Sequence, residues 1–307
     1  MNLETFIAYQ PRGDTVAVIE QANKIIDEYV EQGFTLTLRQ LYYQFVARGL
    51  LENTPQQYKR LGVIIRDARN GGMVRWDAIE DRTREVHTHS AWDSPADIIK
   101  SAAGGYRIDP WLDQLYRPEV WIEKDALLGV IEDICANFRV PYFAHRGNNS
   151  QTLQYEAGKR FESFFDHGLI PLILHLADHD PNGIDMTRDN RDRLSLYAGE
   201  PVEVRRIGLN MDQVRRYRPP PNFAKESDTR SAGYMKTFGT DKCWELDALS
   251  PVVIAALIRD AIEPLIDQRK WEASLKREQR GRNQLRAVAS NWATVEKSVS
   301  RRRSRSR

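Results

Sequence analysis

Two aspartates, Asp178 and Asp180, are the side chains of this sequence whose type and spacing most clearly suggest chemistry. Both come just after a mostly apolar run, 171–177, that has the length of a buried strand. A Pro-Asn-Gly turn comes directly after Asp180. Ligands of open parallel sheets gather just outside the carboxyl ends of the strands, where two carboxylates can hold a divalent cation. The alternative is local: Asp178 ends a strand and Asp180 opens an Asp-Pro turn, which is the commoner meaning of an isolated pair.

A third carboxylate, Glu123, ends an earlier strand-like run and is followed by Lys124. Strands and helices alternate from there onward, with strands expected at 119–124, 140–144, 171–177 and 202–207, and helices at 125–138, 151–166 and 184–197. This alternation predicts an open parallel sheet of the α/β class, with Glu123 and the two aspartates at one edge. Carboxylates that share a site repel one another, which is itself a reason to expect a cation among them.

Three helices are expected before this sheet, and each has recognisable start or stop signals. They are residues 14–32, the stretch from the N-cap Thr37 to Gly49, and the stretch from Thr54-Pro55 to Asn70. Residues 73–79 then have the composition of a short strand. Three helices, a glycine turn and a strand indicate a winged helix-turn-helix, a fold that can place one helix in the major groove of DNA.

Basic residues are concentrated in two regions of the chain. Residues 35–75 carry seven Lys or Arg against two Asp or Glu, and residues 269–307 carry thirteen against three, although the formal net charge is only +2. Basic regions on either side of an acidic middle are typical of a nucleic-acid enzyme with a carboxylate centre, although solvated helix faces give the same counts. In the first region we expect four arginines to contact DNA phosphates: Arg60, Arg66, Arg69 and Arg75.

Length and composition bound the remaining possibilities. A chain of 307 residues with 41% apolar content is long enough for two domains with their own cores. No stretch has membrane-spanning length and the amino terminus lacks the regions of a signal peptide, so we expect an intracellular protein. Cys135 and Cys243 stand in unrelated contexts, which indicates neither a disulfide framework nor a zinc site.

Three other segments have less regular patterns. Residues 90–116 contain several turn formers and are expected to be a linker or a small irregular element. Residues 211–243 are polar, with three consecutive prolines, and are expected to be an irregular substrate loop or a long connection. A helix is expected from Ser250-Pro251, and residues 301–307 are expected to be a disordered basic arm.

The acidic residues belong to two short motifs, Glu123-Lys-x-Ala126 and Asp178-His-Asp180-Pro-x-Gly183. They resemble the Toprim domain of topoisomerases, bacterial primases and some nucleases. Upstream, Arg39-Gln-Leu-Tyr-Tyr43 resembles the A subunit of type IIB DNA topoisomerase (topoisomerase VI) and the related meiotic double-strand-break transesterases. Residues 242–249, Lys-Cys-Trp-Glu-Leu-Asp-Ala-Leu, are similar to the end of that family's Toprim region. The resemblance covers about residues 15 to 260, with the motifs in the family's order.

The resemblance implies a particular domain order within the α/β class. It consists of a CAP-like winged helix-turn-helix domain (1–89), a linker (90–116), a Toprim metal-binding core with a Rossmann-like parallel sheet (117–210), a C-terminal extension with a basic helix (211–300) and the basic tail (301–307).

The resemblance also implies an activity, DNA cleavage by transesterification. Tyr43 would attack a phosphodiester and keep a phosphotyrosyl bond, while Tyr42 is expected to pack in the core. Phenol has a pKa of about 10, so Arg39, one helical turn away on the same face, would favour phenolate or hold the scissile phosphate.

The same resemblance implies a magnesium site and further DNA contacts. Glu123, Asp178 and Asp180 would bind Mg²⁺ through oxygen ligands, with Glu123 as an alternative general base. Lys124 is either a charge neutraliser or a DNA contact, and Arg146 is either a DNA contact or an exposed loop arginine.

The partners implied are double-stranded DNA and a second copy of the chain, because cutting two strands needs two tyrosines. The chain is most similar to the short, stand-alone Mini-A relatives of phages and mobile elements, which implies a cytoplasmic, nucleoid-associated protein of a prokaryote or phage. Nothing in it resembles a GHKL-type ATPase, and the segment that meets the ATPase subunit is expected to be missing. The sequence does not decide whether the chain has an ATPase partner of the B type. Strand passage by this chain alone is not expected.

Two other functions are compatible with the same residues. One is a Toprim nuclease that hydrolyses DNA with a metal-activated water and uses the winged helix only for docking. The other is a non-catalytic DNA-binding protein that assists recombination. The transesterase differs from both in leaving protein covalently attached to DNA.

Overall fold

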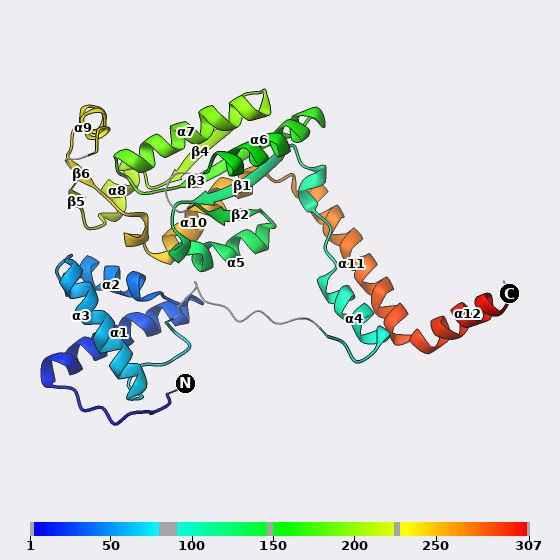
Figure 1. The fold of residues 1–307 in the computed structure, drawn as a ribbon, viewed down its shortest axis with the longest axis horizontal. Helices are drawn as coiled ribbons and strands as arrows, with labels where there is room; N and C mark the ends of the chain where they lie inside the picture. The colour runs from blue at the N-terminus through cyan, green and yellow to red at the C-terminus, as the bar shows by residue number, and fades with distance from the viewer. Residues whose placement is uncertain (1–2, 80–90, 146–149, 224–227, 306–307) are drawn as a thin grey trace. The chain divides into compact units, whose positions relative to one another are not determined.

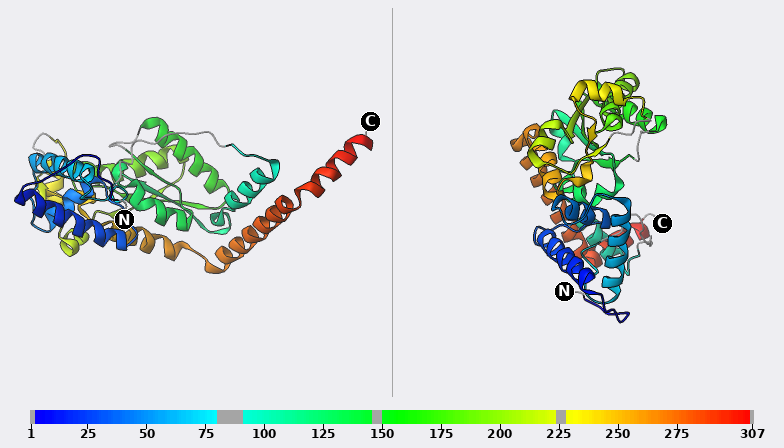
Figure 2. Two further views of the ribbon diagram at one scale, coloured as in Figure 1. Left: turned by 90° about the horizontal axis from the view of Figure 1, so that it is seen from below. Right: turned by 90° about the vertical axis from the view of Figure 1, so that its left-hand side faces the viewer.

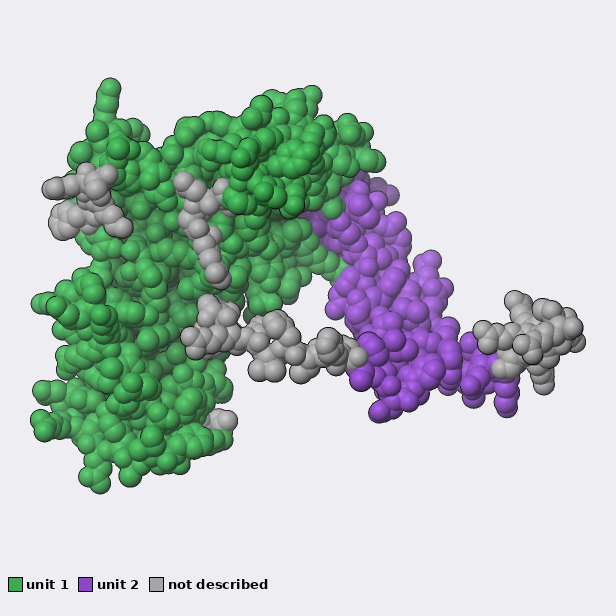
Figure 3. Space-filling model, in the orientation of Figure 1, with its two compact units in different colours: residues 1–84, 117–264 green, residues 85–116, 265–307 purple. Residues whose placement is uncertain are grey.

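The computed structural model describes residues 3–79, 91–145, 150–223 and 228–305. Its contacts divide the chain into two compact units (Figure 3): unit 1 is residues 1–84 with 117–264, and unit 2 is residues 85–116 with 265–307. No helix among the described residues combines the length and apolar character needed to cross a membrane. Arg146, a predicted DNA contact, lies outside the described residues.

A four-stranded parallel sheet forms the centre of unit 1, in the order β2-β1-β3-β4 (Figure 1). Its strands are β1 (Tyr116–Ile122), β2 (Tyr142–Ala144), β3 (Ile170–Leu176) and β4 (Glu203–Gly208). The inner strands β1 and β3 are buried along most of their length, which explains why β3 is a nearly continuous apolar run. The predicted α/β class and parallel sheet are confirmed.

Helices cover both faces of this sheet. Helices α6 (Gln151–Asp166) and α7 (Pro181–Ala198) lie together on one face, and α5 (Leu128–Phe138) and α10 (Pro251–Ile262) lie together on the other (Figure 1). Right-handed crossovers between parallel strands produce this arrangement. The core under α6 and α7 consists of Trp121, Ala157, Phe161, Ile173, Leu194, Ala198 and Val202.

The three predicted N-terminal helices are also confirmed, as α1 (Gly13–Glu31), α2 (Leu38–Ala47) and α3 (Pro55–Asn70). The side chains of Thr37 and Thr54 accept hydrogen bonds from backbone N–H groups of the first turns of α2 and α3, as their sequence positions predict. The helices share one apolar cluster, which also contains Ala248 of the short helix η3 (Leu246–Ala248). This contact joins the N-terminal helices to the rest of unit 1.

The predicted strand at residues 73–79 is wrong. These residues form turns, and a single bridge between Ile79 and Leu36 is the β-pairing that the described residues show there. Burial falls on Val74, Ala78 and Ile79, which is not the alternation of a half-buried strand. An ion pair between Arg75 and Asp77 (2.7 Å) holds the turn.

The interpretation of residues 90–116 as a linker or irregular element is also wrong. They contain α4 (Pro95–Gly105) and the short helix η1 (Pro110–Asp113). Ser94 accepts a hydrogen bond from the Asp97 N–H, so the Ser-Pro pair is a helix start, and the paired glycines are the last residues of that helix. Both helices pack on α11 (Gln268–Ser290), and this packing forms unit 2.

Residues 211–243 contain more regular structure than predicted. The segment forms α8 (Met211–Tyr217), α9 (Ser231–Phe238) and an antiparallel pair, β5 (Asn222–Phe223) with β6 (Lys242–Cys243). Polar side chains are satisfied locally: the Gln213 side chain donates to the Ile207 carbonyl (2.8 Å) and accepts the Asn210 N–H (2.9 Å). Polar composition therefore did not prevent regular structure.

The predicted disorder of the basic tail is wrong as far as Arg305. After a short break at Asn291, α11 is followed by α12 (Trp292–Arg305), whose backbone is helical throughout (Figure 2). Arginine has a high helix propensity, and extending a helix that already exists is far easier than starting one.

Candidate active site

The loop after β3 places the two predicted aspartates at the carboxyl edge of the sheet. Asp180 is the N-cap of α7, and its Oδ1 accepts the Gly183 N–H (2.6 Å). Asp178 is almost buried. A Cβ at Gly183 would overlap the carbonyl oxygen of Asp178, so only glycine fits where α7 begins against this loop. Both interpretations of the sequence therefore meet here: Asp180 caps a helix and also lines the site.

Glu123 joins these aspartates at the neighbouring strand end. Its Oε2 accepts the Asp178 N–H (3.0 Å), while Oδ1 of Asp178 accepts the Leu246 N–H (2.8 Å). Each of the three carboxylates thus has one oxygen fixed by a backbone N–H. In the described part of the chain, the second oxygen of each makes no hydrogen bond or ion pair.

This donor set fits Mg²⁺ by its chemistry, since hard cations prefer carboxylate oxygens. The side chains are not yet gathered tightly: within the described ranges, no three His, Cys, Asp or Glu side chains form a ready-made metal-binding group. Binding would require the unbonded oxygens of Glu123, Asp178 and Asp180 to turn toward one point.

A segment after β6 adds two acidic residues that the sequence did not single out as site residues. His179 and Trp244 exchange backbone hydrogen bonds (2.8 and 3.0 Å), which fixes this segment against the aspartate loop. Glu245 and Asp247 follow directly. His179 itself points into a buried aromatic group, where its Nδ1 lies 2.6 Å from the Tyr234 hydroxyl.

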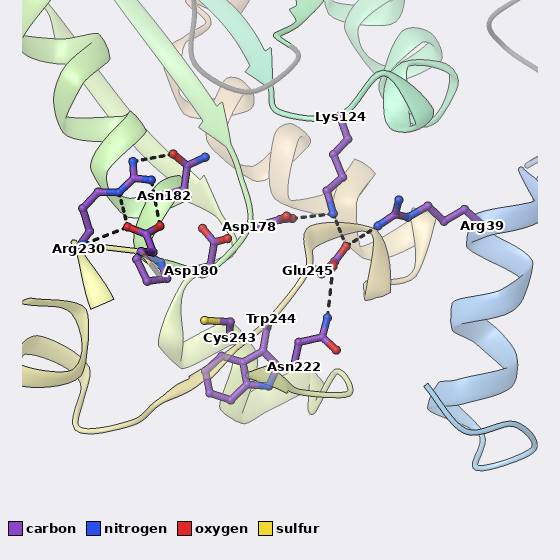
Figure 4. A pocket seen from close by; sticks show the side chains of 12 residues that line it. Arg39, Lys124, Asp178, Asp180, Asn182, Asn222, Arg230, Cys243, Trp244 and Glu245 are labelled. Carbon is purple, nitrogen blue, oxygen red and sulfur yellow. Dashed lines mark hydrogen bonds and ion pairs between the residues drawn. The ribbon is translucent and has the colours of Figure 1, made fainter. Parts of the chain in front are cut away.

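Lys124 lies among these acids as an internal cation (Figure 4). Its Nζ is 3.0 Å from Asp178, 2.6 Å from Glu245 and 3.0 Å from Asp247. Burial raises the pKa of the Asp178 carboxyl to about 8; Lys124 opposes this, and the charge of Glu123 adds to it. Burial would lower the pKa of Lys124, but the three carboxylates raise it above its usual value, so Lys124 stays charged. It acts as a charge neutraliser in this structure.

Arg39 connects Tyr43 to the same acids. Its guanidinium lies 2.7 Å from an oxygen of Glu245 and 2.7 Å from one of Asp247, and it lies over the ring of Tyr43, 5.7 Å from the ring centre. The Asp247 contact is a charge contact without good hydrogen-bond alignment. Burial raises the pKa of Tyr43, Asp247 and Glu245 raise it further, and Arg39 and Lys124 oppose them only in part. Tyr43, which is 6% exposed, is therefore a neutral phenol at pH 7.

Two hollows meet at this cluster and share Arg39, Asn222 and Glu245 in their linings. The larger one, about 670 Å³, lies over the carboxylates and is also lined by Lys124, Asp178, Asp180, Pro181, Asn182, Asp228, Arg230, Cys243 and Trp244 (Figure 4). The smaller one, about 330 Å³, is lined by Tyr42, Tyr43, Tyr58 and residues 53–55. The phenol and the carboxylates thus border adjoining spaces within unit 1.

A half-buried arginine, Arg206 of β4, supports the aspartate loop. Its guanidinium donates to the backbone carbonyls of Ala177, Asp178, Gly183 and Leu209. Burial lowers the pKa of Arg206 to about 10, and the nearby carboxylates oppose this, so the side chain stays charged. It is a positioning residue, because among the described residues its side chain bonds to the loop backbone and to Thr187.

The four predicted DNA-binding arginines lie on or just after α3, and they differ in their exposure and in their contacts. Arg60 is exposed and makes no ion pair with any described residue. Arg66 is paired with Asp67, and Arg75 with Asp77. Arg69 stacks over Trp76 (4.4 Å) and donates to its carbonyl, so it has a structural role.

The acids missed as site residues carried a local signal. Glu245-x-Asp247 repeats the spacing of Asp178-x-Asp180, and it lies in the run that carried part of the family resemblance.

Comparison of the chain with protein-family models, with curated proteins and with solved structures found no match.

Proposed function

We propose that the chain is a Mg²⁺-dependent, DNA-cleaving transesterase of the topoisomerase VI A-subunit type, with a three-helix DNA-binding segment before a Toprim sheet. One observation carries this proposal. Arg39, one turn from Tyr43, and Lys124, next to Glu123, are both ion-paired to Glu245. The tyrosine of α2 and the carboxylate edge of the sheet therefore belong to one charged cluster, as a nucleophile and its phosphate-binding site require.

In the proposed reaction the phenolic oxygen of Tyr43 attacks a backbone phosphorus. The bond from phosphorus to the 3′ oxygen breaks, the phosphate stays on Tyr43, and the 3′ oxygen takes up a proton. The phenol must give up its own proton, and Glu123, whose pKa burial raises, is the candidate acceptor. Arg39 would hold the phosphate and offset its charge.

Asp178 and Asp180 would hold the cation through their unbonded oxygens, with Glu123 as a third ligand in the alternative where it is not the proton acceptor. When bound, Mg²⁺ would position the phosphate and stabilise negative charge on the leaving oxygen. A homodimer on duplex DNA is part of the proposal, because each strand needs its own tyrosine.

Covalent attachment of protein to DNA tests the proposal. Supercoiled DNA is incubated with Mg²⁺ and wild type, Tyr43→Phe, Tyr42→Phe or Asp178→Ala, and the reaction is stopped with denaturant. Tyr42→Phe is the matched control, because the Tyr42 hydroxyl only contacts the backbone and side chains of residues 52–54. We expect DNA-linked protein for wild type and Tyr42→Phe and none for the other two. Adduct that survives Tyr43→Phe would reject the assigned nucleophile.

A second candidate, metal-dependent hydrolysis, is favoured by the burial and raised pKa of Tyr43. In that case Tyr43 only anchors Arg39, and water is the nucleophile. Free broken ends that persist in Tyr43→Phe and disappear in Asp178→Ala would support this candidate over transesterification.

A further inference from the structure

The charged residues of α11 differ sharply between its two sides. Toward α4 and η1 the helix is packed: Trp271 contacts Trp111 edge to face, and Ser274 and Glu278 are buried. The two arginines that reach this side are neutralised, since Arg277 pairs with Asp113 and Arg282 pairs with Glu278.

The opposite side carries Arg269, Lys276 and Arg280, which we call the α11 row. All three are exposed, and none makes an ion pair with another described residue. At about 100° per residue their side chains point within about 40° of one another, on the far side from Glu278. Glu272 is close by in sequence but is likewise unpaired, so it does not neutralise the row through direct contact.

The surroundings of the α11 row are polar and slightly hollowed. Lys276 and Arg280 line a shallow depression of about 580 Å³ together with Gln279, Asn283, Gln284 and Ala287. Amides and cations without large apolar side chains do not suit a membrane surface or an apolar protein partner. They suit an anionic backbone, to which both groups donate hydrogen bonds.

The length of the row matches a repeating phosphate charge. From Arg269 to Arg280 a helix rises about 17 Å at 1.5 Å per residue, and phosphates of one DNA strand follow every 3.4 Å along the duplex axis. Three cations spread over this length can therefore each reach a separate phosphate of the duplex.

We propose that the α11 row is a second binding surface for duplex DNA, which contacts phosphates and is separate from the Tyr43 site. The choice of DNA as the partner rests on the proposed function. The surface supplies affinity without sequence specificity and takes no part in bond cleavage.

Salt-dependent binding tests this surface in the full chain. Affinity for a labelled 40-bp duplex is measured by fluorescence anisotropy from about 50 to 300 mM KCl. The salt slope is the fall of log affinity with log salt concentration, and each phosphate contact contributes about 0.9 units to it. The test variant is Arg269→Gln/Lys276→Gln/Arg280→Gln. The matched control is Arg188→Gln/Arg191→Gln/Arg193→Gln in α7, which removes the same charge from arginines already paired with aspartates.

We expect the α11 variant to lose two to three units of salt slope, about one per contact, and at least about tenfold in affinity at 150 mM salt. The control should stay within about twofold of wild type. The inference is overturned if the α11 variant binds like wild type, if both triple variants weaken equally, or if wild type does not bind the duplex.

Adduct formation at saturating protein separates this inference from the proposed function. The α11 variant should still form covalent adduct, whereas Tyr43→Phe should keep the salt slope and lose the adduct. Loss of slope in the α11 variant without any wild-type adduct would support the surface and reject the transesterase. Loss of adduct at saturation in the α11 variant would reject the separation of the two sites.

Discussion

Glu245 stabilises the folded chain in a way that depends on pH. Burial alone would raise the pKa of its carboxyl, but Lys124 and Arg39 lower it to about 2, from an ordinary value of 4.5. An acid whose pKa is lower in the folded state stabilises the fold above its unfolded pKa and loses this effect as pH falls toward the folded value.

The free energy of unfolding of wild type should therefore fall between about pH 5 and pH 2, and more steeply than that of Glu245→Gln. Urea unfolding at stepped pH measures both slopes. Glu203→Gln, an exposed site paired only with Arg205, should follow wild type. Equal slopes for wild type and Glu245→Gln would contradict the assignment.

Gly183 is restricted by space rather than by backbone angle. In Gly183→Ala the added methyl would push against the Asp178 carbonyl, which Arg206 also contacts, so we expect a loss of about 1–3 kcal/mol of stability. Gly233 in α9 has open space around its Cβ position, and Gly233→Ala should add about 0.5–1 kcal/mol. Chemical unfolding compares the two, and a neutral Gly183→Ala would disprove the close contact.

At the scale of elements, sequence prediction succeeded where the signals are local. Thr37 and Thr54 cap helices through residues three positions away, and the run before Asp178 is a strand that is nearly all buried. Prediction failed for elements whose packing partner lies far away in the sequence. Ser94-Pro95 has the same cap chemistry as Thr54-Pro55, but the surface that covers α4 comes from α11, far along the chain.

The residues of the candidate site also differ in how far they could be predicted. The acidic residues at the strand ends were predictable from the order of strands and helices, whereas Glu245 and Asp247 were not. Arg39 meets Glu245 across 206 positions of sequence, a contact that only the packing of η3 on α2 creates. The roles of these residues in a reaction stay predictions.

Unit 2 depends on one buried carboxylate, Glu278. It accepts the Ile108 N–H (2.8 Å) and pairs with Arg282 (2.7 Å), so it joins the chain before η1 to α11. Glu278→Ala leaves the half-buried Ile108 N–H and Arg282 without this partner, and we expect a loss of about 1–3 kcal/mol.

Hydrogen exchange measured along the chain locates that loss. Amide protection in α4 should fall in Glu278→Ala, while that of β3 in unit 1 stays unchanged. Glu272→Ala, at an exposed site of the same helix, serves as the control and should leave both unchanged. Protection in α4 that survives Glu278→Ala would argue against this role.

For the whole molecule, the positions of Lys124 and Arg206 predict a fold that does not require metal. The positive charges of both side chains offset the negative charges of the site carboxylates in the absence of Mg²⁺. The metal-free protein should therefore still unfold in a cooperative transition. Mg²⁺ at ten times its dissociation constant should then add about 1.4 kcal/mol.

Thermal unfolding with EDTA or Mg²⁺ measures this difference. Asp180→Asn should lose the response to Mg²⁺, and Asp192→Asn, an exposed carboxylate of α7 paired with Arg188, should keep it. Unfolding on chelation, or an unchanged Mg²⁺ response in Asp180→Asn, would contradict the expected donor set.

The division of unit 2 between two distant segments has a consequence for synthesis. Helix α4 is made about 160 residues before α11, its packing partner. At about 5–20 residues per second, a ribosome needs roughly 8–30 s to cover that distance. The strands and helices of unit 1 are complete in the nascent chain by residue 264, just before α11 begins at Gln268. Helix α4, although made before any strand of the sheet, is thus among the last elements to gain its neighbour.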